Sequence, residues 1–412
     1  MNMLTAKEQT AKEPTSEEQN AMQAAPPERP LYFEPNLQIV FIITLIVVMG
    51  VSTIAPALTE IQAAFGITNA AVGLLIVVFT LPGALFAPFF GVLADRYGRK
   101  TVLVPSLLLF GLAGSACSLV RDFDLLLALR FIQGIGAASI GSLNLTIIAD
   151  LFTKRQLATA LGYNASILNL AVPSYLIIGG ALASFAWYYP FALPILAMPV
   201  GVLVMVSLKS PGPHSREDLR AYLSSAFQSV RNPQVLGLLT LTLVTFIMLY
   251  GTYLTYFSLL LGSERFRASP LLIGIVTSSM GLTTALTSAR LGTLTQRYSE
   301  KKLIRLAFSL YALAFLMVTL VPSIWLFFLP TLLFGLAHGL NLPSIQMLLA
   351  RLAPLEYRAA FMSLNGMVLR LGQTLGPLIM GLLYLLGGFE SIFVLSAVLA
   401  VAMIPVAARI VR

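Results

Sequence analysis

The chain alternates long apolar runs with short polar segments. We count twelve apolar runs of about 20 residues, the length that an α-helix needs to cross the hydrocarbon core of a bilayer. Transmembrane β-strands are only about ten residues long and alternate polar with apolar positions, which these runs do not. The pattern therefore predicts an all-α membrane protein with twelve transmembrane helices, at residues 37–57, 71–92, 102–119, 124–148, 157–183, 187–208, 234–260, 271–293, 303–321, 324–348, 359–386 and 391–410.

Two polar segments divide the chain into domains. Residues 1–36 hold six glutamates, three basic residues and five prolines, without the basic-then-apolar pattern of a signal peptide, so we expect a disordered tail. Residues 209–233 separate the sixth and seventh runs and form either an amphipathic surface helix or a simple linker. The remaining domains are then two six-helix bundles, at 37–208 and 234–412.

The composition supports a membrane protein and excludes several other classes. Charged residues make up 10% of the chain, against roughly 25% in a soluble domain, and the mean hydropathy is +0.87. One cysteine excludes an internal disulfide, and two histidines argue against a histidine metal cluster, so we expect no metal and no cofactor. The sequence contains no P-loop, no Gly-x-Ser-x-Gly elbow and no His-Glu-x-x-His, so we expect neither an enzyme nor an ATP-driven pump.

The basic residues are distributed unevenly between the two sides of the predicted membrane. With the N-terminus inside, the cytoplasmic segments and adjoining helix ends hold 20 of the 26 Lys and Arg residues, and the opposite loops hold only Arg121, Arg265 and Arg267. This bias follows the positive-inside rule and places both termini in the cytoplasm. The net charge of +9 therefore reflects topology rather than nucleic-acid binding. We expect a monomer in the lipid bilayer of a bacterial inner membrane.

The two predicted bundles share a sequence repeat. Gly, Leu, Arg, Tyr and Lys of the segment Gly91–Lys100 recur 201 residues later in Gly292–Lys301. Gly134 pairs with Gly335 at the same offset. Such repeats are typical of secondary transporters, in which two similar bundles rock about a site near the middle of the membrane.

Two motifs resemble one known family. The segment Gly91–Lys100 matches the GxLaDRxGRK loop of the major facilitator superfamily, and Arg130–Gly136 is similar to that family's RxxqGxg segment in the fourth span. The resemblance extends over about 36–410. It implies two pseudo-symmetric six-helix bundles around a central cavity, a small-molecule substrate and transport by alternating access, most closely that of twelve-span drug/proton antiporters. The first span lacks the acid that such antiporters often carry, and Val172-Pro173 only partly matches their fifth-span motif.

The resemblance also implies a set of gating residues. In the family, the matching aspartate and second arginine form a charged latch on the cytoplasmic side, which stabilises the outward-facing state and breaks on inward opening. Topology alone explains Arg96 but not Asp95. By resemblance, the gating set is Gly91, Asp95, Arg96, Gly98, Arg99, Asp150 and Arg155.

Polar side chains inside the apolar spans predict a substrate or proton pathway, because ionisable groups are expensive in the membrane. Arg130 serves either proton coupling or helix bracing, and His338 is a proton carrier or a structural residue. Arg370, mid-span on a polar helix face, either meets an anionic substrate or packs against backbone carbonyls. The predicted pathway residues are Arg130, Gln133, Asn144, Tyr163, Asn164, Asn169, Tyr250, Tyr253, His338, Asn341, Asn365, Arg370 and Gln373.

Three functions fit these observations. The first is proton-coupled efflux of drugs or amphipathic compounds. The second is transport of an organic anion or metabolite that Arg370 neutralises. The third belongs to another class, a transporter-like membrane sensor or assembly partner.

Overall fold

The described part of the protein is an assembly of helices. A computed structural model describes residues 31–152, 154–208, 232–352 and 358–410. The predicted linker and nearly all of the predicted tail lie outside these residues. The first half comprises η1 (Leu31–Phe33), α2 (Pro35–Ser52), η2 (Ala55–Ala57), α3 (Leu58–Phe65), α4 (Asn69–Tyr97), α5 (Arg99–Ala116), α6 (Phe123–Leu151), α7 (Lys154–Ala183), η3 (Tyr189–Leu196) and α8 (Ala197–Ser207). The second comprises α10 (Pro233–Ile247), η4 (Met248–Phe257), α11 (Ser258–Gly262), α12 (Pro270–Arg297), α13 (Glu300–Leu320), η5 (Ile324–Phe327), α14 (Phe328–Leu352) and α15 (Arg358–Ile410).

The helices account for the twelve predicted crossings. Within the described residues, ten helical stretches are long and apolar enough to cross a membrane. The last of these, in α15, makes two crossings, because Gly387 and Gly388 leave helical geometry and turn the chain back. The remaining crossing is α5, whose first turn carries Arg99 and Lys100 and whose other residues are mostly apolar. The all-α fold with two six-helix bundles is confirmed.

Polar residues determine where several helices begin. The side chains of Thr68, Asp122 and Ser269 each accept a hydrogen bond from the backbone N–H three residues later, which starts α4, α6 and α12. Such caps satisfy N–H groups that have no partner inside the helix. Gly98 ends α4 and starts α5 with a φ of +96°, a conformation that other residues rarely adopt.

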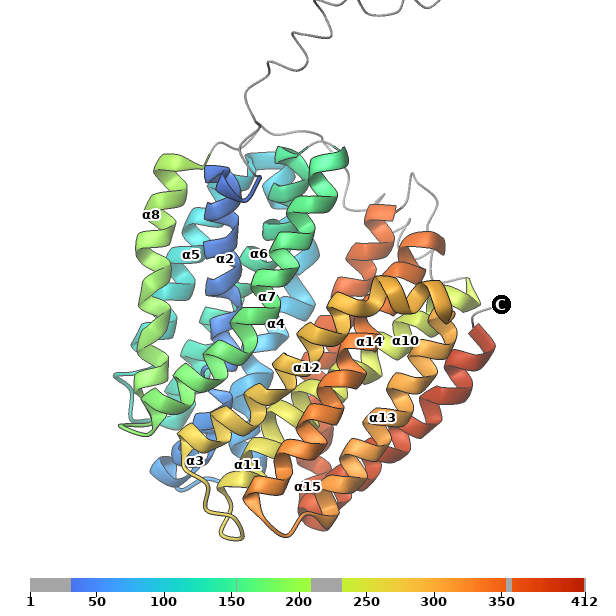
Figure 1. The fold of residues 1–412 in the computed structure, drawn as a ribbon. Coiled ribbons are helices and arrows are strands. Elements are labelled where there is room, and N and C mark those ends of the chain that lie inside the picture. Colours follow the sequence, from blue (N-terminus) through green and yellow to red (C-terminus); the bar gives the residue numbers. More distant parts are fainter. Residues whose placement is uncertain (1–30, 153, 209–231, 353–357, 411–412) are drawn as a thin grey trace, which may run out of the picture.

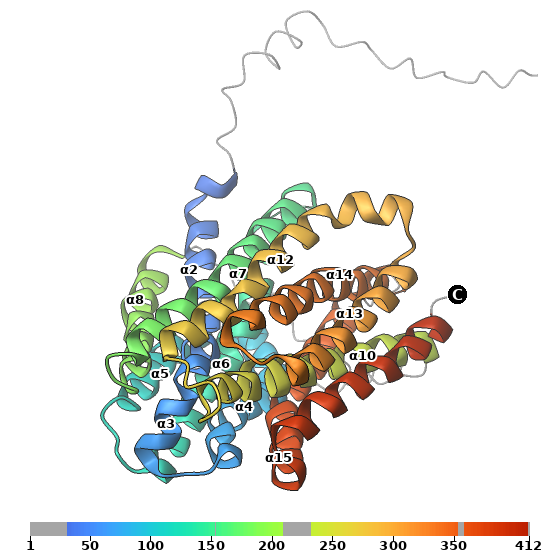
Figure 2. The same ribbon diagram turned by 60° about the horizontal axis from the view of Figure 1, so that its bottom comes forward.

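The two halves pack side by side through four helices (Figure 1). Helix α4 packs against α15, and α7 packs against α12. We call the end of the molecule that carries α3 and α11 the closed end, and the end that carries Tyr97 and Pro233 the latch end. Figure 2 shows α3, α11 and α12 coming together at the closed end.

Close helix contacts hold the closed end together. The Asn69 amide donates to the Tyr384 hydroxyl at 2.6 Å, and Thr374 donates to the Thr80 hydroxyl at 3.0 Å. Gly180 of α7 lies against the backbone of Pro270, where an added Cβ would have no room. The packed interface therefore runs inward from the closed end as far as the middle of the molecule.

The halves are apart at the latch end. In Figure 1 the ribbons of the two halves diverge toward that end. Gly91 of α4, Gly162 of α7, Gly292 of α12 and Gly366 of α15 lie on the four interface helices, beyond the packed region. A Cβ built at any of them would meet no atom within 4 Å among the described residues. These glycines are therefore uncovered in the present arrangement.

Candidate functional site

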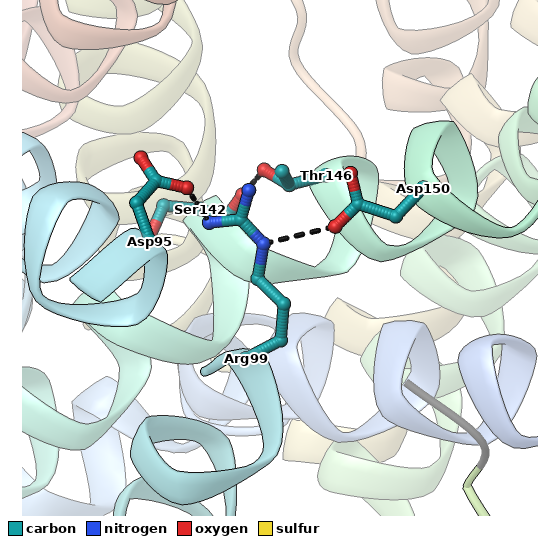
Figure 3. Close-up of polar contacts among 5 residues, drawn as sticks. All are labelled: Asp95, Arg99, Ser142, Thr146 and Asp150. Atoms are coloured by element: carbon teal, nitrogen blue, oxygen red, sulfur yellow. Dashed lines mark hydrogen bonds and ion pairs between the residues drawn. The ribbon is translucent and has the colours of Figure 1, made fainter. Parts of the chain in front are cut away.

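The predicted latch residues meet at the latch end (Figure 3). Arg99, in the first turn of α5, forms an ion pair with Asp95 of α4, and its Nε donates to Asp150 Oδ2 at 3.0 Å. All three side chains are largely covered, with exposed fractions of 11% for Arg99, 28% for Asp95 and 20% for Asp150. The arginine thus ties the ends of α4, α5 and α6 together.

These contacts lie entirely within the first half. They are formed although the two halves are apart at this end, so separation of the halves does not by itself break them. Arg96 is exposed and lies over the Tyr97 ring at 5.5 Å, away from the ion pairs. The side chain of Arg155 lies outside the described part of the chain. Gly91 borders open space, since a Cβ built on it would meet no atom within 4 Å among the described residues.

The second half repeats the latch with its charges exchanged. Glu300 Oε1 forms an ion pair with Arg351 Nη1 at 2.5 Å, which joins the start of α13 to the end of α14. Glu300 stands 201 residues after Arg99, and Arg351 stands 201 residues after Asp150. Each half therefore fastens the same two helix ends by an ion pair of opposite polarity.

Arg130 is completely buried inside the first half and is fully engaged. Its Nη2 donates to Gly50 O at 2.9 Å, its Nε to Leu75 O at 3.3 Å and its Nη1 to Gln133 Oε1 at 2.7 Å. The guanidinium also lies 4.2 Å from the centre of the Phe79 ring. These contacts join α2, α4 and α6, which supports the bracing interpretation of Arg130.

Gly134 and Gly136, in the same segment as Arg130, lie directly against neighbouring helices. A Cβ on Gly134 would lie 3.0 Å from the Phe79 carbonyl carbon, and one on Gly136 would lie 2.7 Å from Ser106 O. Neither backbone can move far without disturbing its helix. The motif therefore lets α6 pack closely against both α4 and α5.

A second polar cluster lies deeper in the first half, between α2, α6 and α7. Thr44 Oγ1 donates to Asn164 Oδ1 at 2.5 Å, and the Asn144 amide donates to Thr44 Oγ1 at 2.6 Å. All three residues are buried. The Asn144 Oδ1 has no hydrogen-bond partner among the described residues. We call these residues the Thr44 network.

The second half contains the corresponding cluster. Thr242 donates to Asn365 Oδ1 at 2.8 Å, and the Asn341 amide donates to Thr245 Oγ1 at 2.7 Å. Asn365 stands 201 residues after Asn164, and Thr245 stands 201 residues after Thr44. Both halves are therefore fastened internally by threonine–asparagine pairs at similar depth.

Two of the predicted pathway residues, Tyr253 and His338, make their contacts within the second half. The Tyr253 hydroxyl donates to Thr277 O at 2.8 Å, and its ring stacks on Phe334 at 4.4 Å. The His338 Nδ1 lies 2.9 Å from the Tyr311 hydroxyl, and both residues are buried. These groups pack η4, α13 and α14 together.

The remaining pathway residues have fewer partners. Tyr163 contacts the Tyr32 ring edge-on at 5.9 Å. Asn169 and Gln373 are half-buried. Neither side chain makes a hydrogen bond with a described residue.

Arg370 lies where the two halves meet in the middle of the molecule. It extends from α15 into the first half, where a Cβ on Gly83 of α4 would lie 2.7 Å from its Nη1. A Cβ on Gly141 of α6 would overlap its Nη2. Tyr250 of η4 is near enough to the guanidinium for an electrostatic interaction. Unlike Arg130, the Arg370 guanidinium has no hydrogen bond or ion pair with a described residue.

Comparison with known proteins decides the family. A sequence profile of the Major Facilitator Superfamily matches residues 40–266 and 241–412. The chain belongs to this superfamily. It is a multi-pass membrane transporter and not an enzyme.

The relatives of this superfamily member include drug-resistance proteins and solute transporters. It is 25% identical over 375 residues to the quinolone resistance protein NorA of Staphylococcus aureus, covering 86% of the chain and 89% of NorA. It is 25% identical over 317 residues to the class C tetracycline resistance protein of Escherichia coli, covering 76% and 79%. Among solved structures, the nucleoside transporter NupG has a TM-score of 0.75 at 13% identity, covering 91% of the chain and 99% of NupG. The human organic anion transporter MFSD10 has a TM-score of 0.67 at 20% identity, covering 93% and 100%.

The pathway residues predicted from the sequence of this superfamily member include no threonine. Thr44, Thr242 and Thr245 hold asparagines that the sequence did predict as pathway residues. The internal repeat could have identified them, because Thr44 and Thr245 share the offset of the loop motif. The same offset could have linked Glu300 and Arg351 to the latch.

Proposed function

We propose that this transporter exports amphipathic small molecules in exchange for protons. The observation that carries the proposal is its similarity, over most of both chains, to two proteins named for resistance to quinolones and to tetracycline. The Bacillus subtilis bacillibactin exporter adds support over a shorter stretch, at 30% identity over 156 residues.

We further propose that the latch end faces the cytoplasm. Basic residues collect there. Arg96 and Arg297 lie at the ends of α4 and α12, and Lys100 and Lys301 lie at the starts of α5 and α13. This is the distribution of the positive-inside rule. With this orientation the present arrangement is the inward-facing state, since the closed end is packed and the latch end is not. The two halves, taken as 37–208 and 234–412, are the units that rock past each other.

The spans offer few candidates for the proton carrier. The acids among the described residues lie at the ends of the helices rather than in the middle of the spans: Glu34, Glu60, Asp95, Asp122, Asp124, Asp150, Glu264, Glu300 and Glu390. His338, which pairs with Tyr311, is the side chain in the described spans whose ordinary pKa lies nearest neutral pH. If it carries the proton, His338→Gln should leave substrate exchange intact and remove its response to a pH gradient.

Flux into proteoliposomes tests the proposed function. Purified protein is reconstituted, and entry of ethidium is followed by its fluorescence on DNA trapped inside, with and without an imposed pH gradient. We expect protein-dependent flux that the gradient accelerates and that a protonophore reduces to the gradient-free rate. Flux equal to that of protein-free vesicles, for ethidium and for a panel of amphipathic compounds, would instead support a sensor or assembly partner.

A further inference from the structure

We propose that Arg370 binds the carboxylate, or a similar planar oxyanion, of an amphipathic substrate at the junction of the two halves. The inference rests on the proposed transport function and names the substrate class of its central site. Arg370 differs sharply in its contacts from Arg130, the other arginine that lies deep within the described spans.

Arg130 shows what a structural arginine requires in this protein. It is fully covered, and each of its three nitrogens donates to an oxygen. Arg370 lies at comparable depth in the helix assembly and is half-buried. Its guanidinium makes none of these bonds with the described residues. A cation within a membrane span is costly unless water or another acceptor solvates it.

The first half packs closely around the Arg370 guanidinium without supplying a hydrogen-bond partner from the described residues. Gly83 and Gly141 present hydrogen atoms where any other residue would present a Cβ against the guanidinium. Val47 of α2 lies beside Gly141 and adds an apolar wall. The site thus consists of a cation from the second half and an apolar, glycine-lined surface from the first.

The described residues do not provide an acid for Arg370. The nearest acids along its own helix and the neighbouring α4 and α6 are Glu390, Asp95 and Asp150, and the two aspartates are already paired with Arg99. A ligand oxyanion would supply the acceptor that these residues do not. A guanidinium offers parallel N–H groups that fit both oxygens of a carboxylate, whereas a lysine offers a point charge.

The position of Arg370 links recognition to the two halves. Its Cα belongs to α15 of the second half, while its Nη atoms touch α4 and α6 of the first. Tyr250 of η4 lies near enough to the guanidinium for an electrostatic interaction and belongs to the second half. A carboxylate held there would contact both halves at once. The apolar remainder of the substrate would lie along the glycine-lined surface.

Binding of a matched ligand pair tests the proposal. The full chain is placed in lipid nanodiscs, and binding of dansylglycine, which carries a carboxylate, is compared with binding of the neutral dansylglycinamide, with empty nanodiscs as the blank. We expect the parent to favour the carboxylate by about tenfold or more. Arg370→Lys should reduce this preference, and Arg370→Gln should remove it. A parent that binds the two ligands equally overturns the proposal without any variant.

Two further readouts separate the outcomes. Gly83→Ala keeps the charge and displaces the guanidinium, so it should weaken dansylglycine binding while dansylglycinamide binding is unchanged. Ethidium flux in the same variants reports the proposed function. If the parent transports ethidium but Arg370→Gln binds dansylglycine as the parent does, the site is wrong and the transport function stands. If the parent transports nothing yet shows the Arg370-dependent preference, the site stands and the transport function fails.

Discussion

At the residue scale, Arg99 holds one end of the first half in place. Its bonds to Asp95 and Asp150 join three helix ends, and Gly98 provides the turn that brings α5 back beside α4. Because the interface helix α4 ends in this cluster, we propose that the latch controls where α4 lies when the two halves come together. This role does not require the ion pairs to break during each cycle.

Replacing Asp95 by asparagine should weaken this control. The amide loses the charge-assisted contact to Arg99, a loss of about 1 kcal/mol for a partly exposed pair. We expect transport to fall several-fold while membrane insertion stays normal. Labelling of a cysteine introduced at the latch end should increase, as the open arrangement gains population.

Arg96→Gln is the matched control for Asp95→Asn. Arg96 adjoins Asp95 but is exposed and has no part in the ion pairs, so this variant should transport at the parental rate. Lost transport in Asp95→Asn with unchanged labelling would refute the gating role.

At the element scale, each half is braced by polar bonds between helices whose surfaces are otherwise apolar. The Thr44 network joins α2, α6 and α7, and Thr242 joins α10 to α15. Lipid tails are as apolar as the helix surfaces, so the hydrophobic effect does not favour one helix pairing over another. Interhelical hydrogen bonds therefore help to specify which helices pack together. These bonds therefore tie helices of the same half to one another.

Removing the hydroxyl of the Thr44 network should destabilise the first half. Thr44→Val keeps the shape of the side chain and leaves two buried asparagines without their shared partner, at a cost of about 1–3 kcal/mol. We expect a lower melting temperature of the purified protein. Thr240→Val is the control, because the partly exposed Thr240 hydroxyl bonds only to Leu236 O on its own helix. Equal melting temperatures for Thr44→Val and the parent would show that the network does not brace the half.

The sequence predicted the elements better than their partners. Runs of apolar residues identify the helices, because the lipid allows no other secondary structure to satisfy the backbone of a chain like this one. The neighbours of Arg370 could not be predicted in this way, since Gly83 and Gly141 belong to other helices. Thr44 was overlooked because a threonine within a span commonly bonds a carbonyl of its own helix, as Thr44 also does with Val40 O.

At the scale of the whole molecule, we propose that the interface can close at either end. Gly180 and Gly274 permit close contact between α7 and α12 near the closed end. Gly162 and Gly292 lie eleven residues, or about three helical turns, from the contacting pair Pro173 and Gly281, so they lie on the same helix faces. They are uncovered here and would meet if the latch end closed.

A cysteine pair at these two glycines tests alternating access most directly. Gly162→Cys and Gly292→Cys are introduced together after the native Cys117 has been replaced by alanine, and the single-cysteine variants serve as controls. A second pair at Ser184 and Leu271, which are already in contact at the closed end, should cross-link in the resting protein.

Transport by the Gly162–Gly292 pair is then measured in proteoliposomes before oxidation, after oxidation and after reduction. We predict that a disulfide forms during turnover, that ethidium flux stops once it has formed, and that reduction restores the flux. A pair that never cross-links in an actively transporting protein, or that transports at full rate while cross-linked, would contradict transport by closure of the latch end.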